Sequence, residues 1–498
     1  MEFTIQILQL LVYLFVALVG VGVLAIGVMY VVDVTQTRHA IRHNFPVVGR
    51  FRYLFEHLGE FFRQYFFALD REEMPFNRAE RSWAYRAAKG ENNTVAFGST
   101  RDLRPTGTLI FANDAYPALD EDGSSDGPVL LGPYCDKPYE APSFFNISAM
   151  SYGSISRPAV RALSRGAAAG GIWLNTGEGG LSEYHLEGGC DIVFQLGTAK
   201  YGVRDAHGRL SEERLADVAG HETVRMFEIK LSQGAKPGKG GILPGAKVTP
   251  EIAAIRGIPE GEDSISPNRH PDVGSAAELL DLIARVRSVT GKPTGFKAVI
   301  GAPEWLDELF LEVLRRGLES APDFITVDSA DGGTGAAPMS LIDNMGLPIR
   351  ESLPMVVDKL DEYDLRPRVR VISSGKLITP VGVAGALCAG ADFVNSARGF
   401  MFALGCIQAM QCNKNTCPTG VTTHDPRLQK GLDVGDKAER VRRYADNLRS
   451  EVGVIAHSCG VSAPRLLRRR HCRVVMDQGR SLPLEEIYPY YAGKRRVA

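Results

Sequence analysis

TGFKAVIG, residues 294–301, is a short apolar run with strand-forming residues that ends in glycine, and Lys297 lies inside it. Seven similar runs occur between residues 144 and 399, separated by Ala- and Leu-rich stretches of helical character. They are FFNISAM (144–150), IWLNTG (172–177), DIVFQLG (191–197), MFEIKLSQG (226–234), FITVDSADGG (324–333), RVRVISSGK (368–376) and FVNSARG (393–399). Eight strands alternating with helices predict an α/β fold, a (β/α)8 TIM barrel. An open doubly wound sheet is the alternative, but it seldom needs eight strands in this length.

The ends of the predicted strands are polar and rich in glycine. Six of them read SAMSYGSIS, NTGEGG, KLSQGAKPGKGG, DSADGGTGAAP, SSGKL and NSARGF. The carboxyl ends of barrel strands carry the chemistry of this fold, and glycine there lets backbone N–H groups approach a ligand closely. The repetition indicates a phosphate-bearing ligand across the barrel mouth.

Three cationic side chains have a functional and a structural interpretation each. Lys297 must be paired or must contact a ligand, since burial of an unpaired ammonium is costly. It could stabilise negative charge on an electron-accepting ring, or it could form a structural ion pair. Lys236 could be a solvated loop lysine and Arg256 a surface residue, but together they could hold a dicarboxylate.

Loop residues at four strand ends complete the candidate site. The NTGEGG loop offers a catalytic position, and the loops after the seventh and eighth strands form the usual phosphate-binding quarter of a barrel. The candidates are Asn175, Thr176 and Glu178 in the first loop, Asp331, Gly332, Gly333 and Gly335 after the sixth strand, and Gly375, Lys376, Arg398 and Gly399 in the last two.

Three of the eight cysteines lie close together in CIQAMQCNKNTCP (406–418), and the other five are scattered. Cys406, Cys412 and Cys417 could form a disulfide, a zinc site or an iron–sulfur site. Zinc prefers four ligands at closer spacing, and the nearest fourth candidate is His424. Three widely spaced thiolates suit an iron–sulfur cluster, but the spacing alone leaves zinc open.

The N-terminal region predicts a membrane anchor. Residues 10–32 contain no charge over 23 positions, and as a helix they would span about 35 Å. Basic residues follow this run, so the positive-inside rule places the rest of the chain in the cytoplasm, at the inner membrane. A cytoplasmic location disfavours a disulfide. A buried core helix is the alternative. The formal net charge of −1 gives no electrostatic support for nucleic-acid binding.

Five motifs in their order along the chain resemble the FMN-binding synthase domain of glutamate synthase. They are SAMSYGSIS, NTGEGG, QGAKPGKGGILPGAKV, ADGGTGAAP and LGCIQAMQCNKNTCPTG, within residues 140–430. The resemblance implies a barrel that holds FMN, with a [3Fe-4S] cluster on Cys406, Cys412 and Cys417. It also implies reductive amination of 2-oxoglutarate with ammonia to L-glutamate, through FMN reduced by way of the cluster.

The resemblance also assigns roles to single residues. It places Lys297, Gln195 and residues 148–151 (Ser148, Ala149, Met150 and Ser151) near the flavin. Gln233 and Lys236 would lie between flavin and substrate. Glu178 is a further catalytic candidate from its place after the second strand alone, where it could also be a simple turn residue. Arg256 would bind a carboxylate of 2-oxoglutarate.

The chain departs from full-length glutamate synthases. We find no glutaminase domain, no C-terminal β-helix domain and no GxGxxG motif for NAD(P)H. The ammonia source and the electron donor, a ferredoxin or a separate NAD(P)H-oxidising subunit, are therefore expected to be external. The expected parts are an anchor (1–35), a helical juxtamembrane and lead-in region (36–140), the synthase domain (141–430) and a helical C-terminal extension (431–498). Another 2-oxo acid or amine as substrate, or a catalytically inactive membrane-anchored scaffold, are the alternatives.

Overall fold

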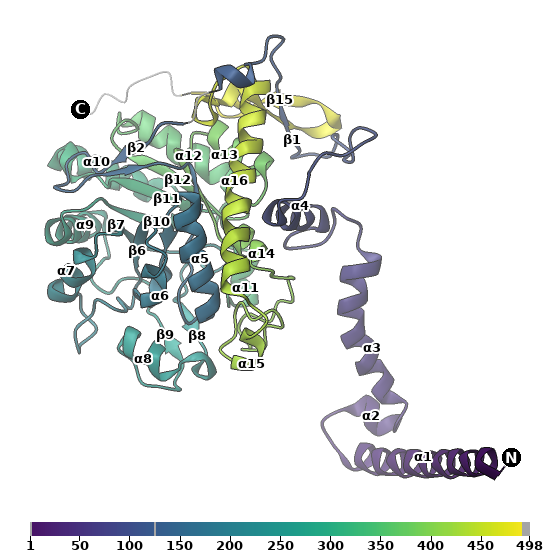
Figure 1. The fold of residues 1–498 in the computed structure, drawn as a ribbon. Coiled ribbons are helices and arrows are strands. Elements are labelled where there is room, and N and C mark those ends of the chain that lie inside the picture. The colour runs from purple at the N-terminus through teal and green to yellow at the C-terminus, as the bar shows by residue number, and fades with distance from the viewer. Residues whose placement is uncertain (1, 124–125, 491–498) are drawn as a thin grey trace. The chain divides into compact units, whose positions relative to one another are not determined.

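The computed structural model describes residues 2–123 and 126–490. The chain forms two compact units, Met1–Ala79 and Glu80–Ala498. Figure 1 shows the first unit as a series of helices and the second as a barrel surrounded by helices.

The first unit begins with the long apolar helix α1 (Glu2–Thr35). An 18-residue window within it has a mean hydropathy of 2.7, and none of that window is buried. By length and composition this helix could cross a membrane. The helices α2 (Ala40–Asn44) and α3 (Gly49–Phe62) follow, and α3 continues into a π-helical turn, Arg63–Phe67.

The second unit contains a closed barrel of eight parallel strands, as the sequence predicts. The strands are β4 (Phe145–Ile147), β5 (Leu174–Asn175), β6 (Ile192–Leu196), β7 (Val224–Lys230), β10 (Thr294–Val299), β11 (Phe324–Asp328), β12 (Arg370–Ser374) and β13 (Phe393–Ser396). Each lies within, or overlaps, one of the eight predicted runs, and β13 closes the barrel by pairing with β4. The closure excludes the open doubly wound sheet.

Helices between the strands cover the barrel. The principal ones are α5 (Arg157–Gly170), α7 (Glu212–Gly220), α9 (Ala276–Thr290), α10 (Glu304–Arg316), α12 (Ile349–Glu362) and α13 (Pro380–Cys388). Four of them, α5, α7, α9 and α13, begin with a side-chain cap. In α5, for example, the Ser156 hydroxyl accepts from the backbone N–H of Ala159, and the helix stops at Gly171 with φ 60°.

A hairpin of β2 (Val129–Leu131) and β3 (Tyr139–Ala141) packs on the amino-terminal end of the barrel. Leu131 and Tyr139 belong to one buried cluster with Trp173, Phe324 and Phe393 from the barrel. The opposite end, where the carboxyl ends of the strands lie, carries the candidate site.

The segment after the barrel is only partly helical. The helix α16 (Val434–Ser458) packs along α5, and its Tyr444 lies against Phe145 and Phe400. The chain then forms β14 (Cys472–Val475) and β15 (Ser481–Pro483). These two strands build a three-stranded sheet with β1 (Leu109–Phe111), and so connect the C-terminal segment to the lead-in region.

Candidate functional site

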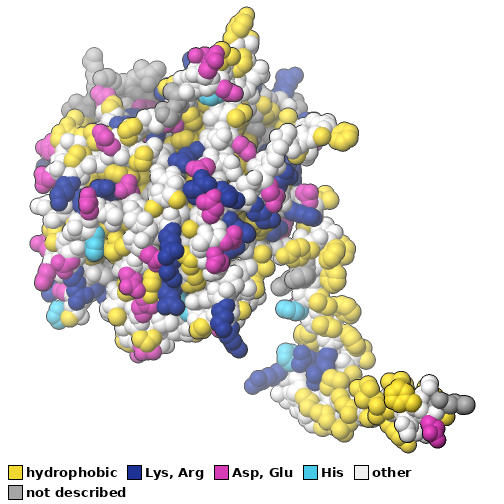
Figure 2. All heavy atoms as spheres, in the orientation of Figure 1, with side chains coloured by type: hydrophobic (Ala, Val, Ile, Leu, Met, Phe, Trp, Pro, Cys, Tyr) yellow, Lys and Arg dark blue, Asp and Glu magenta, His cyan; other side chains and the backbone are white. Residues whose placement is uncertain are grey.

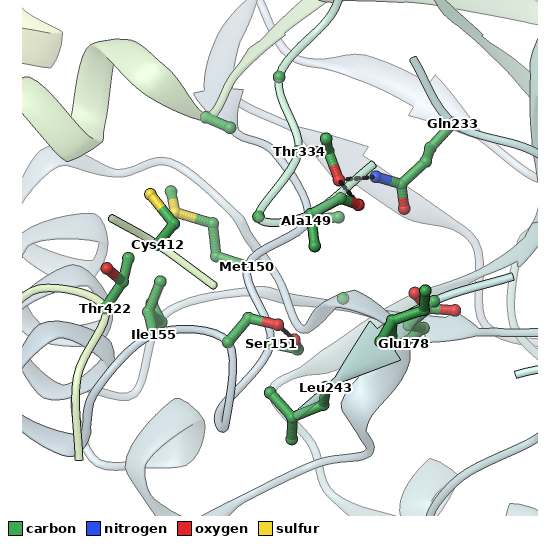
Figure 3. A pocket seen from close by; sticks show the side chains of 18 of the residues that line it. Ala149, Met150, Ser151, Ile155, Glu178, Gln233, Leu243, Thr334, Cys412 and Thr422 are labelled. Atoms are coloured by element: carbon green, nitrogen blue, oxygen red, sulfur yellow. Dashed lines mark hydrogen bonds between the residues drawn. The ribbon is translucent and has the colours of Figure 1, made fainter. Parts of the chain in front are cut away.

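A pocket lies at the carboxyl ends of the barrel strands, and its lining comes from many separate stretches of the chain. It contains about 910 Å3 of empty space, part of which is open to solvent. Figure 3 shows Gln233 and Thr334 on one side, Cys412 and Thr422 on another, and Ala149 and Met150 between the two.

The strongest polar contact in this pocket joins Lys230 and Glu178. Lys230 ends β7, Glu178 lies in the short helix Gly177–Gly179, and Nζ is 2.7 Å from Oε1. Lys230 Nζ also donates to Gln233 Oε1 at 2.5 Å. Burial has the largest single effect on the pKa of Glu178 and raises it. The charge and hydrogen bond of Lys230, together with the charges of Lys236 and Arg256, outweigh burial and lower this pKa to about 2. Glu178 is therefore a carboxylate held by a buried cation.

Lys236 and Arg256 supply two further cations to the lining. Burial and the nearby charge of Lys230 lower the pKa of Lys236 to about 8. Arg256, at the end of α8 (Pro250–Arg256), donates to Ser264 Oγ at 3.2 Å and to the carbonyl of Tyr152 at 3.4 Å. Its buried Nε has no hydrogen-bond partner among the described residues. A ligand carboxylate would suit this group of cations.

A buried glutamate that sequence reasoning missed, Glu228 of β7, organises the strands beneath the pocket. Its Oε1 accepts from Asn175 at 2.8 Å and from Gln195 at 2.7 Å, and its Oε2 accepts from Thr326 at 2.6 Å. The signal in the sequence was an acidic residue inside the apolar run MFEIK, comparable to Lys297 inside GFKAVI. Lys230 in the same run was also missed, and the signal for it is again a charged residue inside an apolar run.

The residues predicted to hold a flavin surround the barrel mouth. The nearest carboxylate oxygen to Lys297 Nζ is that of Asp328 at 3.8 Å, and Asp328 also accepts from Gly234 N at 3.0 Å. Lys297 is thus a buried ammonium with a distant counter-ion, as a cation beside an anionic ring would be.

Two loops at the predicted phosphate-binding quarter are closely packed. Gly375 has φ 108°, and a Cβ there would lie 2.4 Å from the Cβ of Ser329. Lys376 pairs with Asp331 at 3.0 Å, and Arg398 donates to the carbonyl of Thr334 at 2.5 Å. A glycine at positive φ and two cations therefore lie on neighbouring loops, and these are the donor types that bind a phosphate.

The pocket brings together only part of the predicted set. Its lining includes Ala149, Met150, Ser151, Glu178, Gln195, Gln233, Lys236, Arg256, Gly333, Gly335, Arg398 and Cys412. Outside the lining lie Ser148, Asn175, Thr176, Lys297, Asp331, Gly332, Gly375, Lys376, Gly399, Cys406 and Cys417. Of these, Asn175 and Thr176 have clear structural bonds, since both fix the start of the glycine-rich turn at Gly177.

The three clustered cysteines do not form a metal site in this structure. Among residues 2–123 and 126–490, no group of three His, Cys, Asp or Glu side chains could hold a metal ion. All three cysteines are free, and Cys417 Sγ lies 3.4 Å from Thr419 Oγ1. The donor types suit an iron–sulfur cluster, but their arrangement does not fit one. These residues form no zinc site either, among those that the structure describes. His424, the nearest fourth candidate, contacts the carbonyl of Gly153.

A buried lysine lies close to this loop. Lys247 Nζ donates to the carbonyl of Ser154 at 2.7 Å and reaches that of Cys412 at 3.4 Å. Burial lowers the pKa of Lys247 to about 8, against the opposing effect of Cys412 and Cys417. Cys412 and Cys417 therefore lie near the same cation.

Residues 122–462 match the family described as the conserved region in glutamate synthase. The chain belongs to the glutamate synthase family. The glutamate synthase large subunit-like protein YerD of Bacillus subtilis is 40% identical over 511 residues, which cover 94% of this chain and 97% of that protein. The match confirms the predicted family.

Two further relatives extend the comparison. An archaeal-type glutamate synthase [NADPH] of Thermotoga neapolitana is 33% identical, covering 72% of this chain and 68% of its own length. A glutamate synthase large subunit-like protein of Rhizobium meliloti is 29% identical, covering 75% and 85%. Membership of this family identifies a glutamate synthase-type oxidoreductase.

Proposed function

We propose that this chain is an FMN-dependent enzyme that forms L-glutamate from 2-oxoglutarate and ammonia. Ammonia adds to the keto carbon and water leaves, which gives 2-iminoglutarate. The imine carbon then receives a hydride and the nitrogen a proton. The convergence of Lys230, Lys236, Arg256 and Glu178 on one pocket, in a chain of this family, carries the proposal.

The residues that would hold FMN are those of the barrel mouth. Gly375, Lys376 and Arg398 would contact its phosphate, and Lys297 and Gln195 would lie near its ring. The remaining predicted flavin contacts, Ser148–Ser151, Asn175, Thr176 and the loop Asp331–Gly335, belong to the same proposal. When bound, FMN would supply the hydride that reduces the imine.

The cations of the pocket would bind and orient the substrate. Arg256 is fixed by Ser264 and the Tyr152 carbonyl, so its guanidinium is preorganised for a carboxylate. Lys236 would bind the second carboxylate or the carbonyl oxygen. Glu178, ionised beside Lys230, would accept the proton that the nitrogen loses after ammonia has added to the keto carbon. Gln233, held by Lys230 and Thr334, would position the substrate against the flavin.

A [3Fe-4S] cluster on Cys406, Cys412 and Cys417 remains part of the proposal, supported by the motif and not by the arrangement of the thiols. Its formation requires the loop to bring the three thiols together. Iron and acid-labile sulfide analysis of anaerobically reconstituted protein tests it, with Cys412→Ser as the variant and Cys135→Ser as the control. If both variants retain the same amount of iron, Cys412 is not a ligand and the proposed cluster is excluded.

The electron donor is proposed to be external, either a ferredoxin or a separate NAD(P)H-oxidising subunit. We also propose that α1 anchors the chain in the cytoplasmic membrane with the barrel in the cytoplasm, a location supported by its length and by the basic residues after it. The division into an anchor (1–35), a juxtamembrane and lead-in region (36–140), a synthase domain (141–430) and a C-terminal extension (431–498) is part of the same proposal.

The test is an anaerobic half-reaction with the detergent-solubilised full chain. The flavin is reduced chemically, and 2-oxoglutarate and ammonium are added separately and together. Reoxidation that needs both, with glutamate as product, supports the proposal. A flavin that stays reduced with both but reacts with another 2-oxo acid or amine would favour the substrate alternative. Failure to bind any flavin would favour the inactive scaffold.

A further inference from the structure

The helix α3 presents an apolar stripe to solvent. Phe51, Leu54, Phe55, Leu58 and Phe62 recur at helical spacing along it. The exposed fractions of Phe51, Phe55 and Phe62 are 54%, 65% and 43%. Residues at these intervals share one helix face, so the stripe is continuous. A stripe of large aromatic side chains at such exposure requires a covering partner.

The stripe continues beyond the helix. Phe66, Phe67 and Leu69 follow α3 and are 70%, 73% and 66% exposed. The side of α3 away from the stripe carries Arg52, Glu56 and His57, all exposed. An apolar aromatic face opposite a charged and polar one is typical of helices that lie in the interface between headgroups and acyl chains.

The start of α3 is fastened to the end of α1. Asp33, in the last turns of α1, is buried and accepts from Arg50 Nε and NH2, both at 2.8 Å, and from Val47 N at 3.0 Å. The Arg42 guanidinium lies 4.7 Å from the centre of the Tyr53 ring. The chain therefore begins α3 at the level where the apolar helix ends.

Within this unit, the direction of α3 differs from that of α1. Figure 1 shows α3 running across the line of α1 and not continuing it. If α1 spans the bilayer, α3 then runs along the membrane surface. In Figure 2, hydrophobic side chains gather on the side of α3 that faces into the corner between α3 and α1, which is the side the bilayer would occupy.

We propose that α3 and the segment to Leu69 bind the cytoplasmic face of the lipid bilayer, with the stripe Phe51, Leu54, Phe55, Leu58 and Phe62 inserted at the acyl-chain boundary. This inference rests on the proposed membrane anchoring by α1. Arg38, Arg42 and Arg52 lie close to this stripe in the sequence. Their positive charges favour anionic headgroups. Lipid, and not another protein, is the partner, because the stripe starts at the end of the membrane helix.

The experiment is photo-crosslinking from single positions of the full chain. p-Benzoylphenylalanine replaces Phe55 in one variant and His57, on the opposite helix face, in a matched control. Each variant is reconstituted by α1 into vesicles of phosphatidylcholine with one-quarter phosphatidylglycerol. After irradiation, mass spectrometry counts lipid adducts. We expect adducts at position 55 to exceed those at position 57 by about tenfold.

Three outcomes are informative. Resistance to alkaline carbonate extraction with lipid adducts concentrated at position 55 supports the inference. Resistance with equal adducts at both positions, or with cross-links from position 55 to other parts of this chain or to a second copy, overturns it and leaves the anchoring intact. Complete release by carbonate overturns the anchoring itself, and the interfacial helix with it.

Discussion

Lys230 Nζ and Glu178 Oε1 lie 2.7 Å apart, and their side chains are only 7% and 15% exposed. The pair joins the end of a barrel strand to the glycine-rich turn after β5. Because both charges are largely removed from water, loss of either one leaves its partner without compensation.

Replacement of either member alone should therefore lower the free energy of unfolding, because it leaves the other charge buried and unpaired. We expect Lys230→Met and Glu178→Gln each to lower the free energy of unfolding by about 3–5 kcal/mol. The double variant should lose less than the sum, as a double-mutant cycle in urea would measure. The exposed pair Arg104–Asp102 is the control, and Arg104→Ala should have a much smaller effect. Additive losses at positions 178 and 230 would contradict the coupling.

The same pair predicts an acid dependence of stability. The pKa of Glu178 is lowered from 4.5 to about 2, so its contribution is fully present above its ordinary pKa and is lost as pH falls toward about 2. Thermal unfolding of the chain and of Glu178→Gln should therefore converge in midpoint between these pH values. If the difference between the two midpoints stays constant over this pH range, Glu178 is not responsible for the acid dependence of stability.

Lys236 predicts an effect at the opposite end of the pH scale. Its pKa is lowered to about 8 by burial and by Lys230, so the free enzyme loses this cation as pH rises through 8. If Lys236 binds a substrate oxygen, kcat/KM for 2-oxoglutarate should fall above that pH, and Lys236→Gln should abolish the inflection. Lys239→Gln, in the same loop, is the control. An unchanged inflection in Lys236→Gln would assign it to another group.

The fold could be read from the sequence because each barrel strand carries its own signal. TGFKAVIG and FITVDSADGG combine strand-forming residues with a polar, glycine-rich end, and they became β10 and β11. Short strands are harder to delimit. In IWLNTG only Leu174–Asn175 pairs as a strand, since the glycine-rich turn begins at once.

The site was less predictable, because contacts between distant loops leave no local pattern. Arg256 and Lys236 could be proposed, but Glu228, which binds Asn175 and Gln195, could not be linked to them from spacing. The cysteine loop illustrates the opposite case. Its spacing suggested a metal site, but the three thiols are free and belong to no group among the described residues that could hold a metal ion.

Arg256 should distinguish substrates with one and with two carboxylates. Arg256→Gln should raise KM for 2-oxoglutarate by about tenfold or more, since a charged hydrogen bond is worth roughly 1.5–3 kcal/mol, and should affect pyruvate less. Arg204 is a matched control, because its guanidinium also lies over the Tyr201 ring but is solvent-exposed and does not line the pocket. Arg204→Gln should leave both KM values unchanged. An equal change for both substrates in Arg256→Gln would place the arginine away from the second carboxylate.

Two glycines near the proposed phosphate site should respond differently to alanine. Gly375 has φ 108°, and an added Cβ would lie 2.4 Å from Ser329 Cβ and 3.0 Å from its backbone nitrogen. Gly335 has nothing within 4 Å of an added Cβ. Gly375→Ala should therefore displace the loop that carries Lys376, at a cost of about 1–3 kcal/mol, and reduce the FMN bound after reconstitution. Gly335→Ala should keep stability, because nothing crowds an added Cβ there. Full flavin binding by a destabilised Gly375→Ala would separate this loop from the cofactor.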